Sequence, residues 1–206
     1  MIFLWAFVFL LAIAVLCLHL YSNQIIGKIG ENHTAKRIKA VCGEHVFQDV
    51  YVPGSRGVQQ IDILAVTEKG VLVIEKKTYI GLVVGRNFDK QWKVYVNRGR
   101  KNYTMKNPHH QNFGHIQALC ENFPALQGKC VDLVIFGNNA KLGNGISKGT
   151  IRDAEFENFY ASLPLRLSEN EVSQFGNMIS GLSTKRAALK KKHCRKIKQM
   201  KSRFAK

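Results

Sequence analysis

The sequence predicts an α/β fold in which helices flank a mixed sheet, preceded by an N-terminal transmembrane helix. Residues 2–21 contain no Asp, Glu, Lys or Arg, and a helix needs about 20 apolar residues to cross a bilayer. Two β-branched runs, QQIDILAV (59–66) and VLVIEKK (71–77), flank a four-residue turn, which is typical of a hairpin. Helical and strand patterns then alternate along the chain, as they do in α/β domains.

The apolar N-terminal segment favours an uncleaved membrane anchor. Trp5 and Tyr21 lie near its ends, where aromatic side chains anchor in the membrane interface. A cleaved signal peptide would carry Lys or Arg before a shorter apolar run. The first basic residues after the segment are Lys28, Lys36, Arg37 and Lys39. By the positive-inside rule, we expect a single-pass membrane protein whose soluble domain is cytoplasmic.

Turn residues and periodicity predict the remaining elements in order. A helix over 27–41 should continue from the anchor after a break at Gly27 and Gly30. Asn107 followed by Pro108 marks the start of another helix. The other expected helices cover 168–182 and the tail from 185, and the expected strands cover 45–53, 59–66, 71–77, two short segments within 81–97, and 129–137.

The composition favours a polyanionic partner and excludes several classes of site. The 206 residues carry a net charge of +17, which suits nucleic acid or an anionic membrane surface. The five cysteines are odd in number and none has Cys-x-x-Cys spacing, so we expect neither a disulfide framework nor a zinc ribbon. No phosphate-loop spacing occurs, and no small-molecule cofactor is expected.

The hairpin brings charged side chains together at its open end. If Val66 pairs with Val71, then Asp62 faces Glu75, and Gln60 faces Lys77 on the same side of the sheet. Two carboxylates directly across a ladder are about 5 Å apart at Cβ and repel each other. A divalent cation such as Mg²⁺ or Mn²⁺ would remove the conflict.

Lys77 would then lie beside a metal site, where its ammonium could hold a water molecule or stabilise negative charge on a phosphate. The alternative is structural: Glu75 and Lys77 end a strand in solvent, and Asp62 pairs with Lys77. A register slip of one residue would move Asp62 to the other face and remove the site.

The ordered motifs GEN, QIDILAV, GVLVIEKKTYIG and NPHHQNFGHI, from Gly27 to Gly137, resemble those of the nuclease-related domain (NERD) family. That family resembles the PD-(D/E)xK restriction-endonuclease-like superfamily. The resemblance implies a restriction-endonuclease-like mixed sheet flanked by helices. It also implies Mg²⁺-dependent cleavage of phosphodiester bonds in nucleic acid. DNA is the expected substrate, with RNA as the alternative.

Carried over residue by residue, the resemblance makes Asp62 the metal-binding aspartate, and Glu75 and Lys77 the E-x-K pair. It makes Glu31 the acidic residue of the first helix and a third metal ligand. Gln60 would be a catalytic polar residue lining the site.

The helix at 107–123 and the residue after the E-x-K lysine complete this comparison. Gln111 and His115 are the residues of the helix expected to line the site, with packing of the helix as the structural alternative. Thr78 departs from the family, which often has Asn there. The predicted segments are an anchor at 1–22, a nuclease-like domain at 23–140, an extension with a helix at 141–184 and a basic tail at 185–206.

The basic tail could follow nucleic-acid phosphates, lie on an anionic membrane or remain solvated. Its candidate contacts to nucleic acid or lipid are Lys190, Lys191, Lys192, Arg195 and Lys196. The sequence thus predicts a membrane-anchored, cytoplasmic nuclease-like protein. The alternative is a non-catalytic module on the same fold that binds nucleic acid or anionic membranes.

Overall fold

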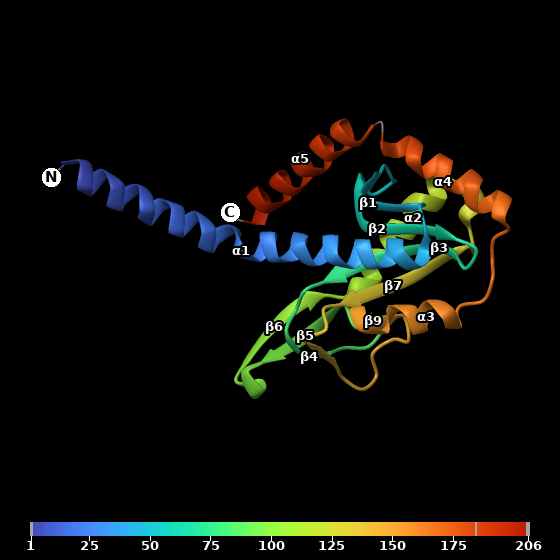
Figure 1. The fold of residues 1–206 in the computed structure, drawn as a ribbon, viewed down its shortest axis with the longest axis horizontal. Helices are drawn as coiled ribbons and strands as arrows, with labels where there is room; N and C mark the ends of the chain where they lie inside the picture. The colour runs from blue at the N-terminus through green and yellow to red at the C-terminus, as the bar shows by residue number, and fades with distance from the viewer. Residues whose placement is uncertain (1, 184, 205–206) are drawn as a thin grey trace.

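The computed structural model describes residues 2–183 and 185–204, and it has the mixed α/β architecture that the sequence predicts. A five-stranded sheet has the order β1-β2-β3-β7-β9, and a four-stranded sheet has the order β6-β5-β4-β8. Figure 1 shows the second sheet projecting from the body, while the first half of helix α1 leads away from it.

The strands are β1 (Val46–Val52), β2 (Gln59–Thr67), β3 (Gly70–Lys77), β4 (Gly81–Val84), β5 (Gln91–Val96), β6 (Lys101–Lys106), β7 (Cys130–Phe136), β8 (Ala140–Leu142) and β9 (Thr150–Arg152). The α-helices are α1 (Ile2–Cys42), α2 (Pro108–Asn122), α3 (Phe156–Ser162), α4 (Glu169–Ser183) and α5 (Arg186–Phe204). Short 3₁₀ turns cover Asn97–Gly99, Pro124–Leu126 and Asp153–Glu155.

Helix α1 runs unbroken for 41 residues, so the break predicted at Gly27 and Gly30 is wrong. Gly30 serves close packing instead. A Cβ at this position would lie 2.4 Å from Cγ2 of Thr78, which follows β3. The second half of α1 lies against the first sheet, where Ala35 and Ile38 are buried.

The transmembrane prediction is also wrong. Crossing a bilayer takes about 20 consecutive apolar residues in one helix. No helix reaches that combination of length and apolar character within the part of the chain that the structure describes. This finding overturns the anchor at 1–22 and the single-pass membrane location. Within α1, the side chains at 2–4, 6, 12–14, 16–21 and 23–24 lie outside the described residues.

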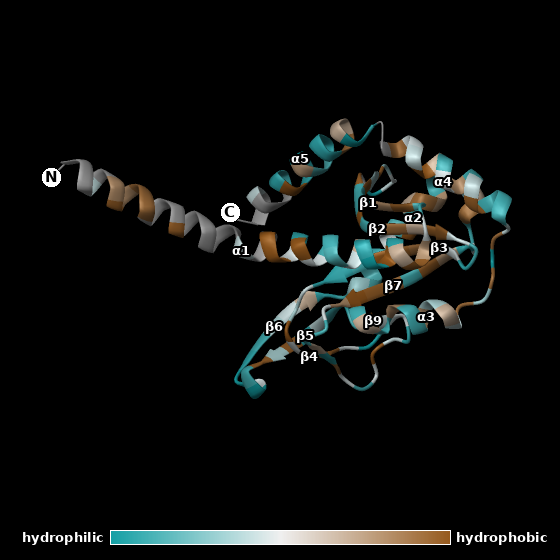
Figure 2. Cartoon of the chain, in the orientation of Figure 1, coloured by the Kyte–Doolittle hydropathy of each residue, from teal (hydrophilic) through white to brown (hydrophobic). Residues whose placement is uncertain are grey.

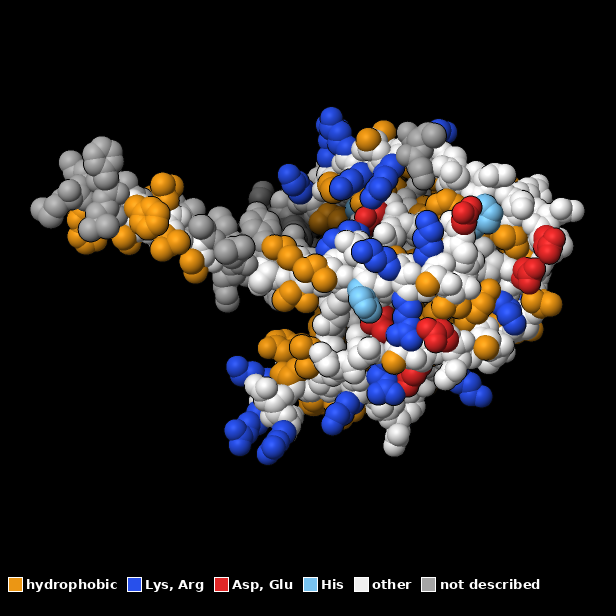
Figure 3. Space-filling view, viewed as in Figure 1, with side chains coloured by type: hydrophobic (Ala, Val, Ile, Leu, Met, Phe, Trp, Pro, Cys, Tyr) orange, Lys and Arg blue, Asp and Glu red, His pale blue; other side chains and the backbone are white. Residues whose placement is uncertain are grey.

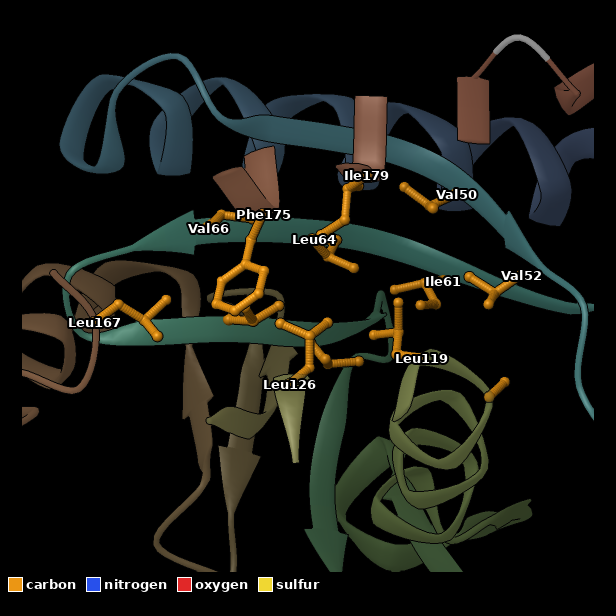
Figure 4. Packing of buried hydrophobic residues seen from close by; sticks show 13 residues of the cluster. Val50, Val52, Ile61, Leu64, Val66, Leu119, Leu126, Leu167, Phe175 and Ile179 are labelled. Atoms are coloured by element: carbon orange, nitrogen blue, oxygen red, sulfur yellow. The ribbon is translucent and has the colours of Figure 1, made fainter. Parts of the chain in front are cut away.

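The central strands β2, β3 and β7 are buried on both faces, and in Figure 2 they are largely brown. On one face α2 and α4 cover them, and Figure 4 shows Phe175 and Ile179 of α4 beside Leu64 of β2. On the other face α1 and α3 contribute Ile38 and Phe156. Strands covered on both sides read as continuous apolar runs, as VLVI does here.

The second sheet packs on the end of β7 through Trp92 and Val94, which are fully buried with Phe136. Asn107 fixes it to α2. The Asn107 side chain caps the helix by accepting from His109 N at 2.9 Å, and its Nδ2 donates to the Asp89 carbonyl at 2.8 Å. The N-cap therefore also secures the loop between β4 and β5.

Helices α4 and α5 complete the fold. Ser168 and Glu171 form the expected capping box at the start of α4, since each side chain bonds the other's backbone amide. Helix α5 lies against the β1 side of the sheet: His193 Nδ1 is 2.8 Å from the Val58 carbonyl, and Arg186 pairs with Asp49 at 3.0 Å. The predicted helical tail is confirmed over Arg186–Phe204.

Candidate active site

The hairpin register that the site depends on is confirmed. Val66 pairs with Val71 and Leu64 with Val73, so the strands keep the predicted alignment. The β2–β3 ladder ends at the pair of Ile63 and Ile74, whereas on its other edge β3 pairs with β7 as far as Lys77. Beyond this point Asp62 reaches across with its side chain, and its carboxylate accepts from the backbone N of Lys76 at 3.0 Å.

Glu75 is the most enclosed acidic side chain of the hairpin, with 5% of its surface exposed. Lys77 Nζ donates to its Oε1 at 2.7 Å, and His115 Nε2 lies 3.3 Å from its Oε2. Lys77 also donates to Gln111 Oε1 at 3.0 Å. Gln111 and His115 are one helical turn apart on α2, so the same face of that helix supplies both contacts.

Burial and mutual repulsion give the two carboxyls different pKa values. Burial, followed by the negative charge of Glu75, raises the pKa of Asp62 to about 8. Burial would raise the pKa of Glu75 as well, but the His115 hydrogen bond and the Lys77 ammonium outweigh it and lower that pKa. The environment therefore favours the protonated form at Asp62 and the ionised form at Glu75.

The two remaining predicted residues lie in a neighbouring polar cluster. Gln60 Nε2 donates to Asp49 Oδ1 at 2.9 Å, and its amide does not contact the lysine that it was expected to face. Glu31 accepts from Lys28 Nζ at 2.8 Å, and Lys28 also bonds Asp49. The charge of Glu31 still contributes to raising the pKa of Asp62, so its carboxylate lies within electrostatic range.

Lys76 points to the opposite face, as alternation predicts, and is buried there. Its Nζ lies 2.5 Å from Asp153 Oδ2, while Thr34 Oγ1 donates to Asp153 Oδ1 at 2.5 Å. Burial lowers the pKa of Lys76, and the bond with Asp153 opposes that shift. Thr34 and Asp153 carry no sequence signal for this role because they are 119 positions apart.

Sequence reasoning also missed a buried polar network that holds α2 on the sheet. Asn112 Nδ2 donates to the carbonyls of Val73 at 2.9 Å and Leu133 at 3.0 Å, and so connects α2 to β3 and β7. His109 lies 2.6 Å from Asp132 through Nδ1 and 2.8 Å from Thr150 through Nε2. The sequence does contain one indication of this network: the polar residues HHQN (109–112) lie near the start of a helix that covers a sheet.

The described residues contain no group of three or more His, Cys, Asp or Glu side chains arranged to hold a metal ion. Mg²⁺ in proteins commonly uses only one or two carboxylates and completes its shell with water and substrate phosphate. Asp62 and Glu75 are therefore the candidate ligand pair, with Glu31 nearby but bonded to Lys28.

The predicted basic contacts form a separate surface. Lys190, Lys191, Lys192 and Arg195 are exposed on α5, and Lys196 donates to the Arg56 carbonyl. An open pocket of about 660 Å³ is lined by this part of α5 together with Gly57 and Val58. These side chains form no described contact with Glu75 or Lys77, so the structure does not bring them into the candidate site.

The fold and this site define a mixed α/β protein with two carboxyls and a lysine clustered where two central strands diverge. Comparison with known families identifies it further. The model of the nuclease-related domain matches residues 26–137, more than half of the chain. The chain belongs to the nuclease-related domain family, and Asp62, Glu75, Lys77, Gln111 and His115 all lie within the matched region.

An uncharacterized protein of Bacillus anthracis is 31% identical over 113 residues, which are 53% of this chain and 52% of the relative. The chain therefore spans about half the length of that protein. No solved structure matches.

Proposed function

We propose that the chain is a nuclease that hydrolyses phosphodiester bonds in nucleic acid with the help of a divalent cation. DNA is the favoured substrate, and RNA is the alternative. The observation that carries the proposal is the cluster of Asp62, Glu75 and Lys77, in which the Lys77 ammonium lies 2.7 Å from the buried Glu75 carboxylate, and the charge of Glu75 raises the pKa of Asp62. Membership of the nuclease-related domain family supports the same chemistry.

The two carboxyls fit a hard divalent cation. Their oxygen donors suit Mg²⁺ or Mn²⁺, and a positive charge between them would let Asp62 ionise beside Glu75. Asp62 and Glu75 would hold the ion, and Glu31 could join them once released from Lys28. A bound ion would supply Lewis-acid stabilisation of the phosphate and a more acidic water. Ion binding would release the proton from Asp62.

The chain's own residues divide the remaining work. The Lys77 ammonium would orient the attacking water or neutralise charge that develops on the phosphate oxygens. Gln111 holds that ammonium in position through the 3.0 Å hydrogen bond. His115 keeps Glu75 ionised and therefore able to bind a cation.

The test is nicking of supercoiled plasmid by the full chain with Mg²⁺ or Mn²⁺, against EDTA. Asp62→Ala and Lys77→Ala should each abolish nicking. Glu157→Gln removes an exposed carboxylate on α3 and is the control that should retain it. Nicking that survives both site substitutions would remove this assignment.

A second function is favoured by how fully Glu75 is already engaged. Both of its oxygens have partners, in Lys77 and His115, and the described residues hold no three-ligand cluster. A non-catalytic module that binds nucleic acid would need no metal. It predicts salt-sensitive binding without cleavage, and binding should disappear when residues 185–206 are deleted.

A further inference from the structure

The second sheet presents one face to solvent, and the strand register decides which residues lie on it. Leu82 pairs with Tyr95 on one side and with Lys141 on the other, and Val84 pairs with Lys93. Neighbours across a ladder share a face. Leu82 is 41% exposed and Val84 is 38% exposed, whereas the opposite face carries the buried side chains of Val83, Trp92 and Val94.

One end of this face is hollowed into an open pocket of about 560 Å³. Such a volume lies within the range of small-ligand sites. The lining combines one aromatic ring, two aliphatic side chains, one amide and two cations with two glycines: Gly81, Leu82, Tyr95, Val96, Asn97, Arg98, Gly99 and Lys141. No acidic side chain is among these residues.

The charge of the surrounding segment complements a polyanion. Residues 79–106 contain seven Lys or Arg and a single acidic residue, Asp89. The Asp89 carboxylate is already bonded to the backbone N of Arg86 at 2.8 Å. Figure 3 shows Lys and Arg side chains gathered at the tip of the second sheet, at the lower left of the view.

We propose that this face binds a single strand of nucleic acid, with one base stacked on Tyr95 and the flanking phosphates at Arg98 and Lys141. A positive groove with an aromatic platform is the usual means of binding single strands. A duplex is a poor fit because its base faces are stacked inside the helix. The strand would pass from the pocket towards Lys77, because only residues 78–80 separate β3 from β4.

This inference rests on the proposed function, because it specifies single-stranded nucleic acid as the substrate of the nuclease. Binding can still be measured without cleavage. The full chain is therefore tested in EDTA by fluorescence anisotropy, with an oligothymidylate of about 15 nucleotides and a duplex of equal length. Wild type should bind the single strand more tightly. Tyr95→Leu should weaken that binding about tenfold through lost stacking, while Tyr95→Phe should retain it.

Charge contacts are tested by salt dependence. Arg98→Asn suits the left-handed backbone of this residue (φ 57°) and removes its charge, and Lys141→Gln removes the other charge. Each should lower the slope of log affinity against log salt by about 0.7. Lys39 is an exposed lysine in the last turn of α1, and Lys39→Gln should leave the slope unchanged.

Three results would overturn the proposal: equal binding of duplex and single strand, loss with Tyr95→Phe as large as with Tyr95→Leu, or equal slopes for Lys141→Gln and Lys39→Gln. Since cleavage is absent in EDTA, a failed nicking assay would leave this result intact. Conversely, if wild type nicks plasmid but the variants at Tyr95, Arg98 and Lys141 bind the single strand as wild type does, only this inference is contradicted and the proposed nuclease function is not.

Discussion

Replacing Asp62 with Asn should stabilise the metal-free protein, and increasingly so as the pH rises. Asp62 has its ordinary pKa of 3.8 in the unfolded chain and a pKa of about 8 in the folded one. Its folded-state pKa is raised, so its contribution to stability is fully present below pH 3.8 and is lost as the pH rises towards 8. Asn imitates the protonated acid, and its carbonyl can still accept from the backbone N of Lys76.

The magnitude follows from the two pKa values. Between them, each pH unit costs the folded wild type about 1.4 kcal/mol, because only the unfolded chain releases the proton. At pH 7 this sets an upper limit of about 4 kcal/mol. The expected gain for Asp62→Asn at pH 7 is therefore positive and no larger than this limit.

The assay is urea unfolding of both proteins in EDTA at several pH values from 5 to 9. The difference in the free energy of unfolding should grow up to about pH 8 and then level off. A difference that is independent of pH, or an Asn variant less stable than wild type at pH 8, would refute the reasoning.

Three further substitutions test the framework around the site by urea unfolding. Lys76→Met should destabilise by about 3–5 kcal/mol because it leaves Asp153 buried without its cation, and adding Asp153→Leu should restore most of the loss. Gly30→Ala should destabilise by about 1–3 kcal/mol through overlap with Thr78, but should stabilise in a Thr78→Ser background, where Ala has the better helix propensity. Asn107→Ala should cost about 1 kcal/mol for the lost cap and speed amide exchange in the loop before β5; unchanged exchange there would contradict its anchoring role.

Local patterns were enough to predict much of the fold. The hairpin of β2 and β3, the caps at Asn107 and Ser168, and the strand at β7 all follow from neighbouring residues, and each is confirmed. Strands β6, β8 and β9 were missed because short strands depend on their partners more than on their own composition. The glycines of α1 led to the wrong prediction of a helix break. Gly30 is present because a side chain there would overlap with Thr78, which is distant in the sequence.

For the site as well, features that depend on local patterns were predicted and features that depend on distant contacts were not. The hairpin alternation brings Glu75 and Lys77 to one face, and the structure adds Gln111 and His115 as expected. The position of Gln60 could not be foreseen, because the strands diverge after Ile63 and its amide turns to Asp49. Asp49 belongs to β1, and the hairpin pattern does not specify how that strand aligns with β2.

The most direct test of the central claim is single-turnover cleavage of DNA in Mg²⁺ by wild type and by Lys77→Met, with both proteins purified in parallel. Methionine keeps the length of the lysine side chain but supplies neither charge nor donor. The account predicts cleavage by wild type and a rate lower by about 100-fold or more in the variant. Equal rates in the two proteins would contradict it, as would the absence of metal-dependent cleavage by wild type.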